Sequence, residues 1–220
     1  MVFPPQKPER RAVERDDEVV RQWLDRQWTR IKRLVRRRRA HLVFIDETGF
    51  LLAPLVRRTW APVGQTPVLR QRTRHHRKVS GIGAITISPQ RRRLGYYLHL
   101  HRDGSIGQEQ VIAFLRDLLR HLRGDVVVVW DNLSAHRGRK VREYQARTPR
   151  LHLEYLPPYA PDLNPLEYSW SHTKMNGLAN YCPANVDELH EAVTGATECI
   201  PDEQELLRGF LRATRLPIRL

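Results

Sequence analysis

The sequence predicts an α/β fold in which helices flank a mixed sheet of five strands. Three strand-like segments follow one another in the first half of the chain, and helix-like and strand-like segments alternate after them. A run of strands followed by such an alternation is typical of a mixed sheet with helices on both faces. The 220-residue chain is 40% hydrophobic, which is enough for a core and excludes a disordered basic tail.

The chain begins with a proline-rich segment and a basic helix. Residues 1–11 contain three prolines and are expected to form an extended linker. Residues 12–39 carry apolar side chains at helical spacing and are expected to form a helix that ends in four arginines, Arg36–Arg39. A solvated helix end, which the helix dipole favours, explains that arginine run as well as contact with phosphate does.

The first three strands are predicted from apolar runs and turn residues. Residues 41–46 are apolar and are expected to form a short buried strand. Residues 79–88 and 93–101 are expected to form an antiparallel pair, because a turn-forming Ser-Pro-Gln-Arg joins them. Residues 50–78 are expected to be irregular, with a hairpin around residues 60–69, where proline and glycine mark turns.

The second half of the chain alternates between helices and strands. Residues 107–123 carry an apolar stripe at helical spacing. Residues 126–130 are four valines and a tryptophan, a run typical of a central strand buried on both faces. The ribonuclease-H-like fold has this order of elements. The remaining elements are expected to be a basic helix at 137–147, a strand at 151–156, and helices at 165–178, 185–199 and 202–213.

The positive charge is concentrated in two segments. The formal net charge is +14, and residues 1–41 hold 13 basic and 6 acidic side chains, while residues 50–78 hold seven basic and no acidic ones. A charge this positive is typical of a protein that binds a polyanion, usually nucleic acid. We therefore expect both segments to contact DNA, through Arg36, Arg37, Arg38, Arg39, Arg57, Arg58, Arg70, Arg72, Arg74, Arg77 and Lys78.

Other features of the composition indicate a cellular compartment. The longest apolar runs are too short to span a bilayer, and the N-terminus lacks the apolar stretch of a signal peptide. Two cysteines, Cys182 and Cys199, fit neither a disulfide framework nor a zinc site. We therefore expect a cytoplasmic, nucleoid-associated protein without a membrane partner.

Three carboxylates fall at ends of predicted elements. Asp46 ends the first strand, Asp131 follows the valine strand, and Glu167 lies near the start of a helix. Strand ends are where α/β sheets place ligand-binding groups. Three carboxylates that meet repel one another and need a cation, and hard oxygen ligands select Mg²⁺ or Mn²⁺. Two such ions can activate a water and stabilise the leaving oxygen of a phosphodiester, so the sequence predicts phosphoryl transfer on nucleic acid.

Each carboxylate also has a simpler explanation. Asp46 could be a turn residue, with the adjacent Glu47 as a rival for its role, and Asp131 could begin a loop, since Asp-Asn favours turns. Glu167 occupies the capping-box position of a helix that Asn164 would cap. Capping and metal ligation are alternatives for the Glu167 side chain.

Three segments resemble a known family. They are residues 43–49 (VFIDETG), 130–136 (WDNLSAH) and 156–167 (LPPYAPDLNPLE). They closely resemble the three catalytic blocks of DDE transposases, in the bacterial insertion-sequence branch of the mariner superfamily. Trp170 and Lys174 continue the pattern, and the resemblance covers nearly the whole chain.

The resemblance implies a ribonuclease-H-like catalytic domain with Asp46, Asp131 and Glu167 as ligands of two Mg²⁺ or Mn²⁺ ions. The implied enzyme is an endonuclease that hydrolyses a phosphodiester at a transposon end. The freed 3′ hydroxyl then attacks target DNA, which gives transposition by DNA recombination and integration. A homodimer is expected, because two transposon ends must be held together.

Four further polar residues are weaker candidates for contact with the metal ligands or with phosphate. His136 could contact the scissile phosphate or orient a ligand, but a loop histidine before a helix is an equal alternative. The two asparagines among them equally suit turns. The four residues are Asn132, His136, Asn164 and Lys174.

The resemblance also raises a question of domain organisation. Members of the family usually carry an N-terminal helix-turn-helix region, and no such pair fits in residues 1–41. We expect a linker and basic helix at 1–40 and the catalytic domain at 41–220. The sequence would then be the second reading frame of a frameshifted element, a truncated copy, or a separately expressed catalytic half with a helix-turn-helix partner. Two other functions stay open: a metal-dependent nuclease without strand transfer, and a non-catalytic transposase remnant that binds DNA or inhibits.

Overall fold

The computed structural model describes residues 12–70, 77–214 and 216–218. Its strands form one mixed sheet in the order β3-β2-β1-β4-β5. The strands are β1 (His41–Leu51), β2 (Lys78–Ile87), β3 (Leu94–Arg102), β4 (Val126–Trp130) and β5 (Leu151–Tyr155). The helices are α1 (Asp17–Gln22), η1 (Trp23–Trp28), α2 (Thr29–Arg38), α3 (Gln108–His121), α4 (Arg139–Ala146), η2 (Pro161–Leu163), α5 (Pro165–His172), η3 (Thr173–Gly177), α6 (Val186–Glu198) and α7 (Gln204–Ala213).

The strand pairing confirms the predicted fold class. β1, β2 and β3 form an antiparallel meander, and β1 also pairs in parallel with β4, which pairs in parallel with β5. The first and fourth strands are therefore neighbours, and the molecule has a ribonuclease-H-like mixed sheet of five strands. This arrangement brings the middle of β1 beside the carboxyl end of β4, although the two segments are far apart in the sequence.

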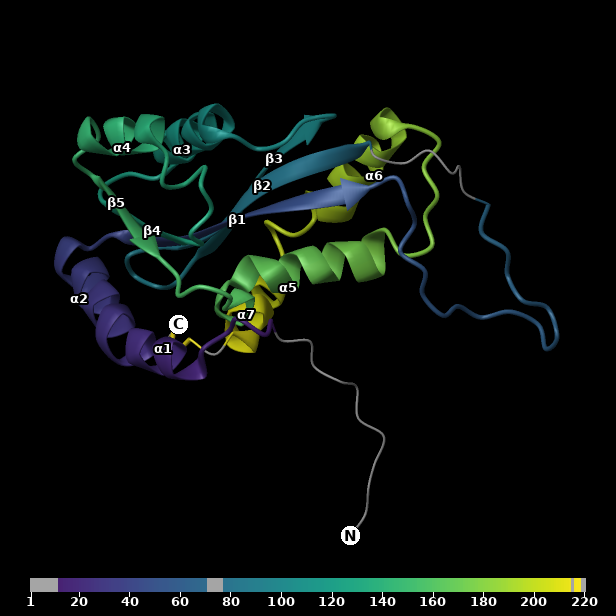
Figure 1. Ribbon diagram of the computed structural model, residues 1–220, viewed down its shortest axis with the longest axis horizontal. Coiled ribbons are helices and arrows are strands. Elements are labelled where there is room, and N and C mark those ends of the chain that lie inside the picture. The colour runs from purple at the N-terminus through teal and green to yellow at the C-terminus, as the bar shows by residue number, and fades with distance from the viewer. Residues whose placement is uncertain (1–11, 71–76, 215, 219–220) are drawn as a thin grey trace, which may run out of the picture.

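Helices cover both faces of the sheet, as Figure 1 shows. α3 and α4 lie on one face, and α2, α5, α6 and α7 lie on the other. The alternation of β4 explains why both faces are apolar: Val128 and Trp130 enter the core under α3, and Val129 enters the opposite core. No helix among the described residues combines the length and apolar character that a membrane span requires.

The predicted N-terminal helix is present as one run from Asp17 to Arg38, and its middle part, η1, is π-helical. Asp16 caps it by accepting hydrogen bonds from two backbone N–H groups of the first turn. Trp28 is only 1% exposed, which shows that the helix is part of the core rather than a free arm. The linker predicted at residues 1–11 lies outside the described part of the chain.

The hairpin predicted around residues 60–69 is wrong. β1 runs on to Leu51, and residues 52–70 form no ladder, only the isolated bridge between Leu55 and Ala179. Trp60 and Val63 are fully exposed, at 101% and 104%. A two-stranded hairpin is marginal in water without a surface to pack on, and these two side chains pack on none of the residues that the structure describes.

Candidate active site

A pocket of about 430 Å³ opens where β4 ends, and the three predicted carboxylates all line it. Asp46 comes from the middle of β1, Asp131 from the residue after β4, and Glu167 from the first turn of α5. The parallel pairing of β1 with β4 brings the first two together. The other lining residues belong to the loops after β4 and β5 and the start of α5: Asn132, Leu133, Leu156, Pro157, Pro158, Tyr159, Ala160, Pro161 and Asn164.

Asp46 is the buried carboxylate of the pocket, with 8% of its surface exposed. The indole Nε1–H of Trp170 donates a hydrogen bond to its Oδ2 over 2.8 Å. Burial raises the pKa of Asp46 well above its ordinary value, and the negative charges of Glu167 and Glu47 raise it further, while the Trp170 hydrogen bond opposes the rise. A cation in the pocket would offset this cost.

Glu167 does not complete the capping box that was its alternative role. Asn164 caps α5 by accepting a hydrogen bond from the Leu166 N–H over 3.2 Å. The backbone N–H of Asn164 donates to the carbonyl of Pro161 over 2.8 Å, so Glu167 is not its acceptor. The Asn164 side chain also donates to the carbonyl of Ile45 over 3.0 Å, which ties the start of α5 to β1 beside Asp46.

The charge state of Glu167 depends on its neighbours in the pocket. Desolvation raises its pKa, Lys174 lowers it, and Asp131 raises it. Lys174 in turn has a lowered pKa because it is desolvated, although Glu167 and Asp46 counteract that effect. The Lys174 Nζ donates to Thr48 Oγ1 over 2.7 Å and lies 5.4 Å from the centre of the Phe50 ring.

His136 is buried and bridges two carboxylates. Its Nδ1 lies 2.8 Å from Oδ1 of Asp131, and its Nε2 lies 2.7 Å from Oε1 of Glu47. Its ring stacks on the indole of Trp130, with centroids 4.1 Å apart. Burial lowers the pKa of His136, but its contacts with Asp131 and Glu47 raise it to about 9, so both ring nitrogens carry a proton at neutral pH. The ring is fully buried, so it does not present a surface to a phosphate.

Glu47, Asp131 and His136 are also the described residues whose possible ligand atoms lie within 4.8 Å of one another. Asp46 and Glu167 do not join that set, although they line the same pocket as Asp131. The two carboxylates lie at opposite nitrogens of the imidazole, and the single positive charge of a protonated His136 offsets one of their two negative charges. The remaining Glu47 oxygen, Oε2, is buried and has no hydrogen-bond partner among the described residues.

From the sequence, Glu47 is predicted only as an alternative to Asp46 for the role of metal ligand. Adjacent residues of a strand point to opposite faces, so Asp46 faces Trp170 while Glu47 faces His136. Trp170 is a core residue, 2% exposed, and its indole N–H also donates to the Asp46 carboxylate. In the sequence, the signal for this contact is that Trp170 lies three residues after Glu167 in a predicted helix, which places both side chains on the same side of that helix.

Asn132 supports the loop that follows Asp131. Its amide nitrogen donates to the carbonyl of Leu156 over 2.7 Å, and its amide oxygen accepts a hydrogen bond from Arg137. The contact ties the loop after β4 to the segment after β5. Asn132 therefore shapes the wall of the pocket.

The structure separates the predicted DNA-contacting residues into two regions. The run Arg36–Arg39 lies at the amino ends of β1 and β4, since Arg38 is 3.9 Å from Asp125, the residue before β4. Asp131 follows the other end of that five-residue strand, about 20 Å from Asp125 at the usual rise per residue. The second region contains Arg57, Arg58, Arg70, Arg77 and Lys78, whereas Arg72 and Arg74 lie outside the described residues.

Two arginines of the second region are engaged with the protein itself. Arg57 donates to the carbonyl of Met175 over 2.6 Å and to Asn176 over 3.0 Å, and Arg77 pairs with Asp103. These contacts tie the segment after β1 to η3 and the start of β2 to the end of β3.

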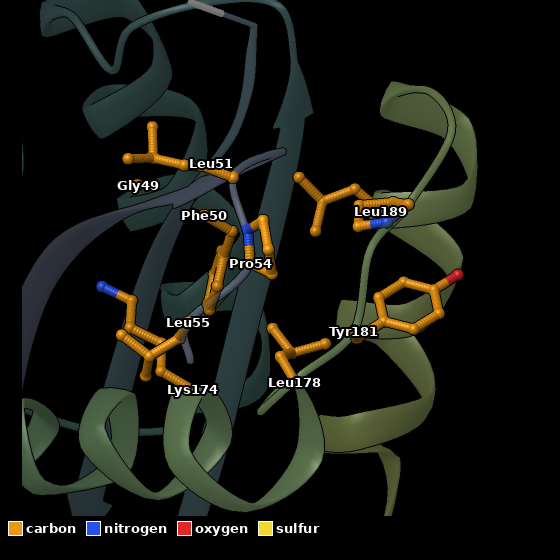
Figure 2. A pocket seen from close by; sticks show the side chains of 11 residues that line it. Gly49, Phe50, Leu51, Pro54, Leu55, Lys174, Leu178, Tyr181 and Leu189 are labelled. Atoms are coloured by element: carbon orange, nitrogen blue, oxygen red, sulfur yellow. The ribbon is translucent and has the colours of Figure 1, made fainter. Parts of the chain in front are cut away.

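A second pocket, of about 370 Å³, lies beyond the end of β1 and is shown in Figure 2. Its lining side chains include Phe50, Leu178, Tyr181 and Leu189. The ammonium group of Lys174 points away from Tyr181 and Leu189 (Figure 2). Among the described residues, no carboxylate, histidine or cysteine lines this pocket, and its titratable side chains are Lys174 and Tyr181.

Comparison with known proteins adds a family and a fold. A family model described as DDE superfamily endonuclease matches residues 41–190. No curated protein sequence matches the chain.

Several solved structures share the fold. The Mos1 mariner paired-end complex with Mn is 17% identical, with a TM-score of 0.64 over 97% of this chain and 65% of that one. The complex with Mg is 19% identical, with a TM-score of 0.63 over 96% and 65%. The Mos1 transposase catalytic domain with raltegravir and Mg is 16% identical, with a TM-score of 0.54 over 93% and 94%. This chain thus spans 65% of the length of the chains in the two paired-end complexes.

Proposed function

The chain belongs to the DDE superfamily of endonucleases, and from that premise we propose that it is the catalytic domain of a DNA transposase. The proposed reaction is metal-dependent cleavage of DNA at transposon ends, followed by strand transfer into target DNA. The proposed branch is the bacterial insertion-sequence members of the mariner superfamily. The observation that carries the proposal is the single pocket that Asp46, Asp131 and Glu167 all line.

The donor set of the pocket fits a divalent cation. Asp46 and Glu167 both have raised pKa values because they are desolvated near other carboxylates, a cost that a cation would remove. Carboxylate oxygens suit Mg²⁺ and Mn²⁺, and the related Mos1 complexes hold Mn or Mg. Asp46, Asp131 and Glu167 would hold two such ions. When bound, these ions supply Lewis-acid chemistry, which activates a water and stabilises the leaving oxygen of a phosphodiester.

The protein's own side chains prepare the pocket for that chemistry. The Trp170 hydrogen bond holds Oδ2 of Asp46, a residue that lines the pocket. His136 restrains the Asp131 carboxylate, and its positive charge reduces the repulsion between Asp131 and Glu47. Lys174 lies beside Glu167 and Asp46, and its positive charge favours their ionised, ligand-competent forms. These contacts hold the carboxylates ready before substrate arrives.

DNA and a second copy of the chain are the proposed partners. Large apolar side chains stand exposed along the segment after β1, including Val56 at 74% and Trp60 at 101%. Exposed apolar groups of this size favour a protein partner, which supports a homodimer that holds two transposon ends. Recognition of a specific end sequence is assigned to a helix-turn-helix, in a longer protein or in a separately encoded partner.

Charge-neutral replacements of the carboxylates test the proposal. Asp46→Asn, Asp131→Asn and Glu167→Gln are each expected to abolish Mn²⁺-dependent nicking of a supercoiled plasmid and to retain DNA binding. The matched control is Glu191→Gln, which neutralises an exposed carboxylate on α6. Nicking retained in any of the three variants would remove that residue from the site.

A second assay separates the alternatives. Wild-type protein is given a labelled, pre-cut DNA end with a free 3′ hydroxyl and a target plasmid. Joining is expected from a transposase. Nicking without joining would assign a nuclease, and DNA binding without either activity would assign a non-catalytic remnant.

A further inference from the structure

A groove of about 400 Å³ lies between η1 and the end of β5. The wall on the side of η1 is formed by Val19, Gln22, Trp23, Arg26 and Gln27. The opposite wall is formed by Asn132, Arg137, Glu154, Tyr155, Leu156, Pro157 and Pro158. We refer to it as the η1–β5 groove.

The η1–β5 groove is continuous with the carboxylate pocket. Four residues line both: Asn132, Leu156, Pro157 and Pro158. Asn132 is the neighbour of Asp131 in the chain, so the groove begins one residue from a proposed metal ligand. A strand whose scissile phosphate lay in the pocket would have its next nucleotides at the mouth of this groove.

The groove carries an excess of positive charge. Arg26 is exposed and forms no ion pair with any residue that the structure describes. Arg137 is held with its guanidinium 5.1 Å from the centre of the Tyr155 ring and donates to Asn132. The one acidic lining residue, Glu154, is neutralised by Arg30, which donates to its Oε1 over 3.0 Å. Two arginines therefore remain for an anion.

Long-range contacts build both walls of the groove. The Trp23 Nε1–H donates to the carbonyl of Tyr155 over 2.9 Å, which holds η1 on the edge strand. Arg15, just before the helix, donates to the carbonyl of Tyr159 over 3.3 Å and pairs with Asp162. These contacts join the N-terminal helix to the segment after β5 that also lines the carboxylate pocket. The groove is thus part of the folded structure and not a gap between loose segments.

We propose that the η1–β5 groove binds the DNA strand that continues past the scissile phosphate, with Arg26 and Arg137 neutralising its backbone phosphates. This inference rests on the proposed function, because it takes the carboxylate pocket as the place of cleavage. Tyr155 and the two prolines present an apolar surface to sugars and bases, and Gln22, Gln27 and Asn132 are hydrogen-bonding groups beside it. The combination of arginines and an aromatic ring is typical of surfaces that track a single strand.

The salt dependence of DNA binding tests the groove. The probe is a labelled duplex with a single-stranded extension, presented in either strand polarity. Each phosphate contact contributes about 0.7 to 0.9 to the slope of log affinity against log salt. Arg26→Gln and Arg137→Gln are each expected to lower the slope by that amount, and to weaken binding roughly tenfold at low salt, the loss of one charge-assisted contact. Arg26→Lys, which keeps the charge, is expected to retain the slope.

The control is Arg116→Gln on α3, on the opposite face of the sheet. Arg116 is also exposed and without an ion pair among the described residues, so the variant removes the same charge elsewhere. We expect it to bind and nick DNA like the wild type, whereas the groove variants nick more slowly at limiting DNA.

The outcomes separate this inference from the proposed function. If Arg26→Gln matches Arg116→Gln in slope and nicking rate while the wild type nicks DNA, the groove assignment is overturned and the proposed function stands. If Arg26→Gln changes the oligomeric state and leaves DNA binding unchanged, the groove holds a second copy of the chain, and the inference is again overturned. If the wild type neither binds nor nicks DNA, the proposed function itself fails.

Discussion

The indole N–H of Trp170 donates a 2.8 Å hydrogen bond to Oδ2 of Asp46, and both side chains are buried. Trp170 lies three residues after Glu167 on α5, so the two side chains share one side of that helix. One helix thus supplies a carboxylate to the pocket and holds the carboxylate of β1 in place. The bond links the packing of α5 on the sheet to the geometry of the proposed metal site.

Removing that donor should weaken metal binding. Trp170→Phe keeps the ring but loses the hydrogen bond, and a bond to a charged group contributes about 1.5–3 kcal/mol. The pKa of Asp46 should then rise further, so we expect Mn²⁺ affinity at pH 7 to fall about tenfold or more by calorimetry. The control is Trp28→Phe, because the Trp28 Nε1 is buried without a partner among the described residues. Equal Mn²⁺ affinity in both variants would refute a positioning role for Trp170.

Gly83 leaves room for Trp170 and should not tolerate a side chain. Gly83 pairs with Asp46 in the β1–β2 ladder, and a Cβ there would lie 2.6 Å from Cη2 of Trp170. Overpacking of a core costs about 1–3 kcal/mol, so Gly83→Ala should lower the free energy of unfolding in urea by that amount. Gly195→Ala on α6 is the control, since its Cβ would meet nothing within 4 Å. It should be neutral or stabilise by up to about 1 kcal/mol.

Asp46→Asn should stabilise the metal-free protein. The pKa of Asp46 is raised in the folded state, so between about pH 3.8 and that raised value the folded chain binds more protons than the unfolded chain. The free energy of unfolding therefore falls as pH rises through this window, and an asparagine does not ionise. Thermal unfolding in EDTA at pH 7.5 should show a higher Tm for Asp46→Asn than for wild type.

Metal should reverse that order. Excess Mg²⁺ should raise the stability of the wild type by about 2.7 kcal/mol at a hundred times its Kd, and should leave Asp46→Asn unchanged. Asp131→Asn is the comparison, because Asp131 pairs with His136, and its loss should destabilise the metal-free protein. An Asp46→Asn variant less stable than wild type in EDTA would contradict the repulsion inferred for the pocket.

The buried His136 bridge predicts a second pH dependence. Burial lowers the pKa of His136, but Asp131 and Glu47 raise it to about 9, above the unfolded value of about 6.5. The bridge therefore contributes its full stability below about pH 6.5 and loses it as pH rises through 9, by up to about 3 kcal/mol. Urea unfolding in EDTA from pH 6 to 10 should show this decline in wild type and in the control His121→Gln, an exposed histidine of α3.

His136→Gln should remove most of the decline between pH 6.5 and 9. The variant should also be less stable than wild type at pH 6, because Glu47 and Asp131 lose the charge between them. A decline of equal size in His136→Gln would assign the effect to another group.

The sequence by itself determined the elements and their order. Helical spacing, the valine run of β4 and the capping residue Asn164 act over a few neighbouring residues, so their effect is visible in the chain. The position of Asp131 directly after β4 follows from the same local signals, whereas Asp46, expected at the end of its strand, lies in the middle of β1 because pairing with β2 extends that strand to Leu51. These signals sufficed for the ribonuclease-H-like sheet and for the carboxylates that line one pocket.

Only the tertiary structure decided which side chains meet. Glu47 and His136 are 89 positions apart, and they touch because β1 pairs with β4 and because adjacent strand residues face opposite ways. The η1–β5 groove arises in the same way, from a helix near the start of the chain docked on an edge strand. The hairpin predicted around residues 60–69 does not form, because turn residues alone do not stabilise strands that have no surface to pack against. Local periodicity specifies elements, whereas a site depends on contacts between distant segments that a pattern of neighbouring residues does not contain.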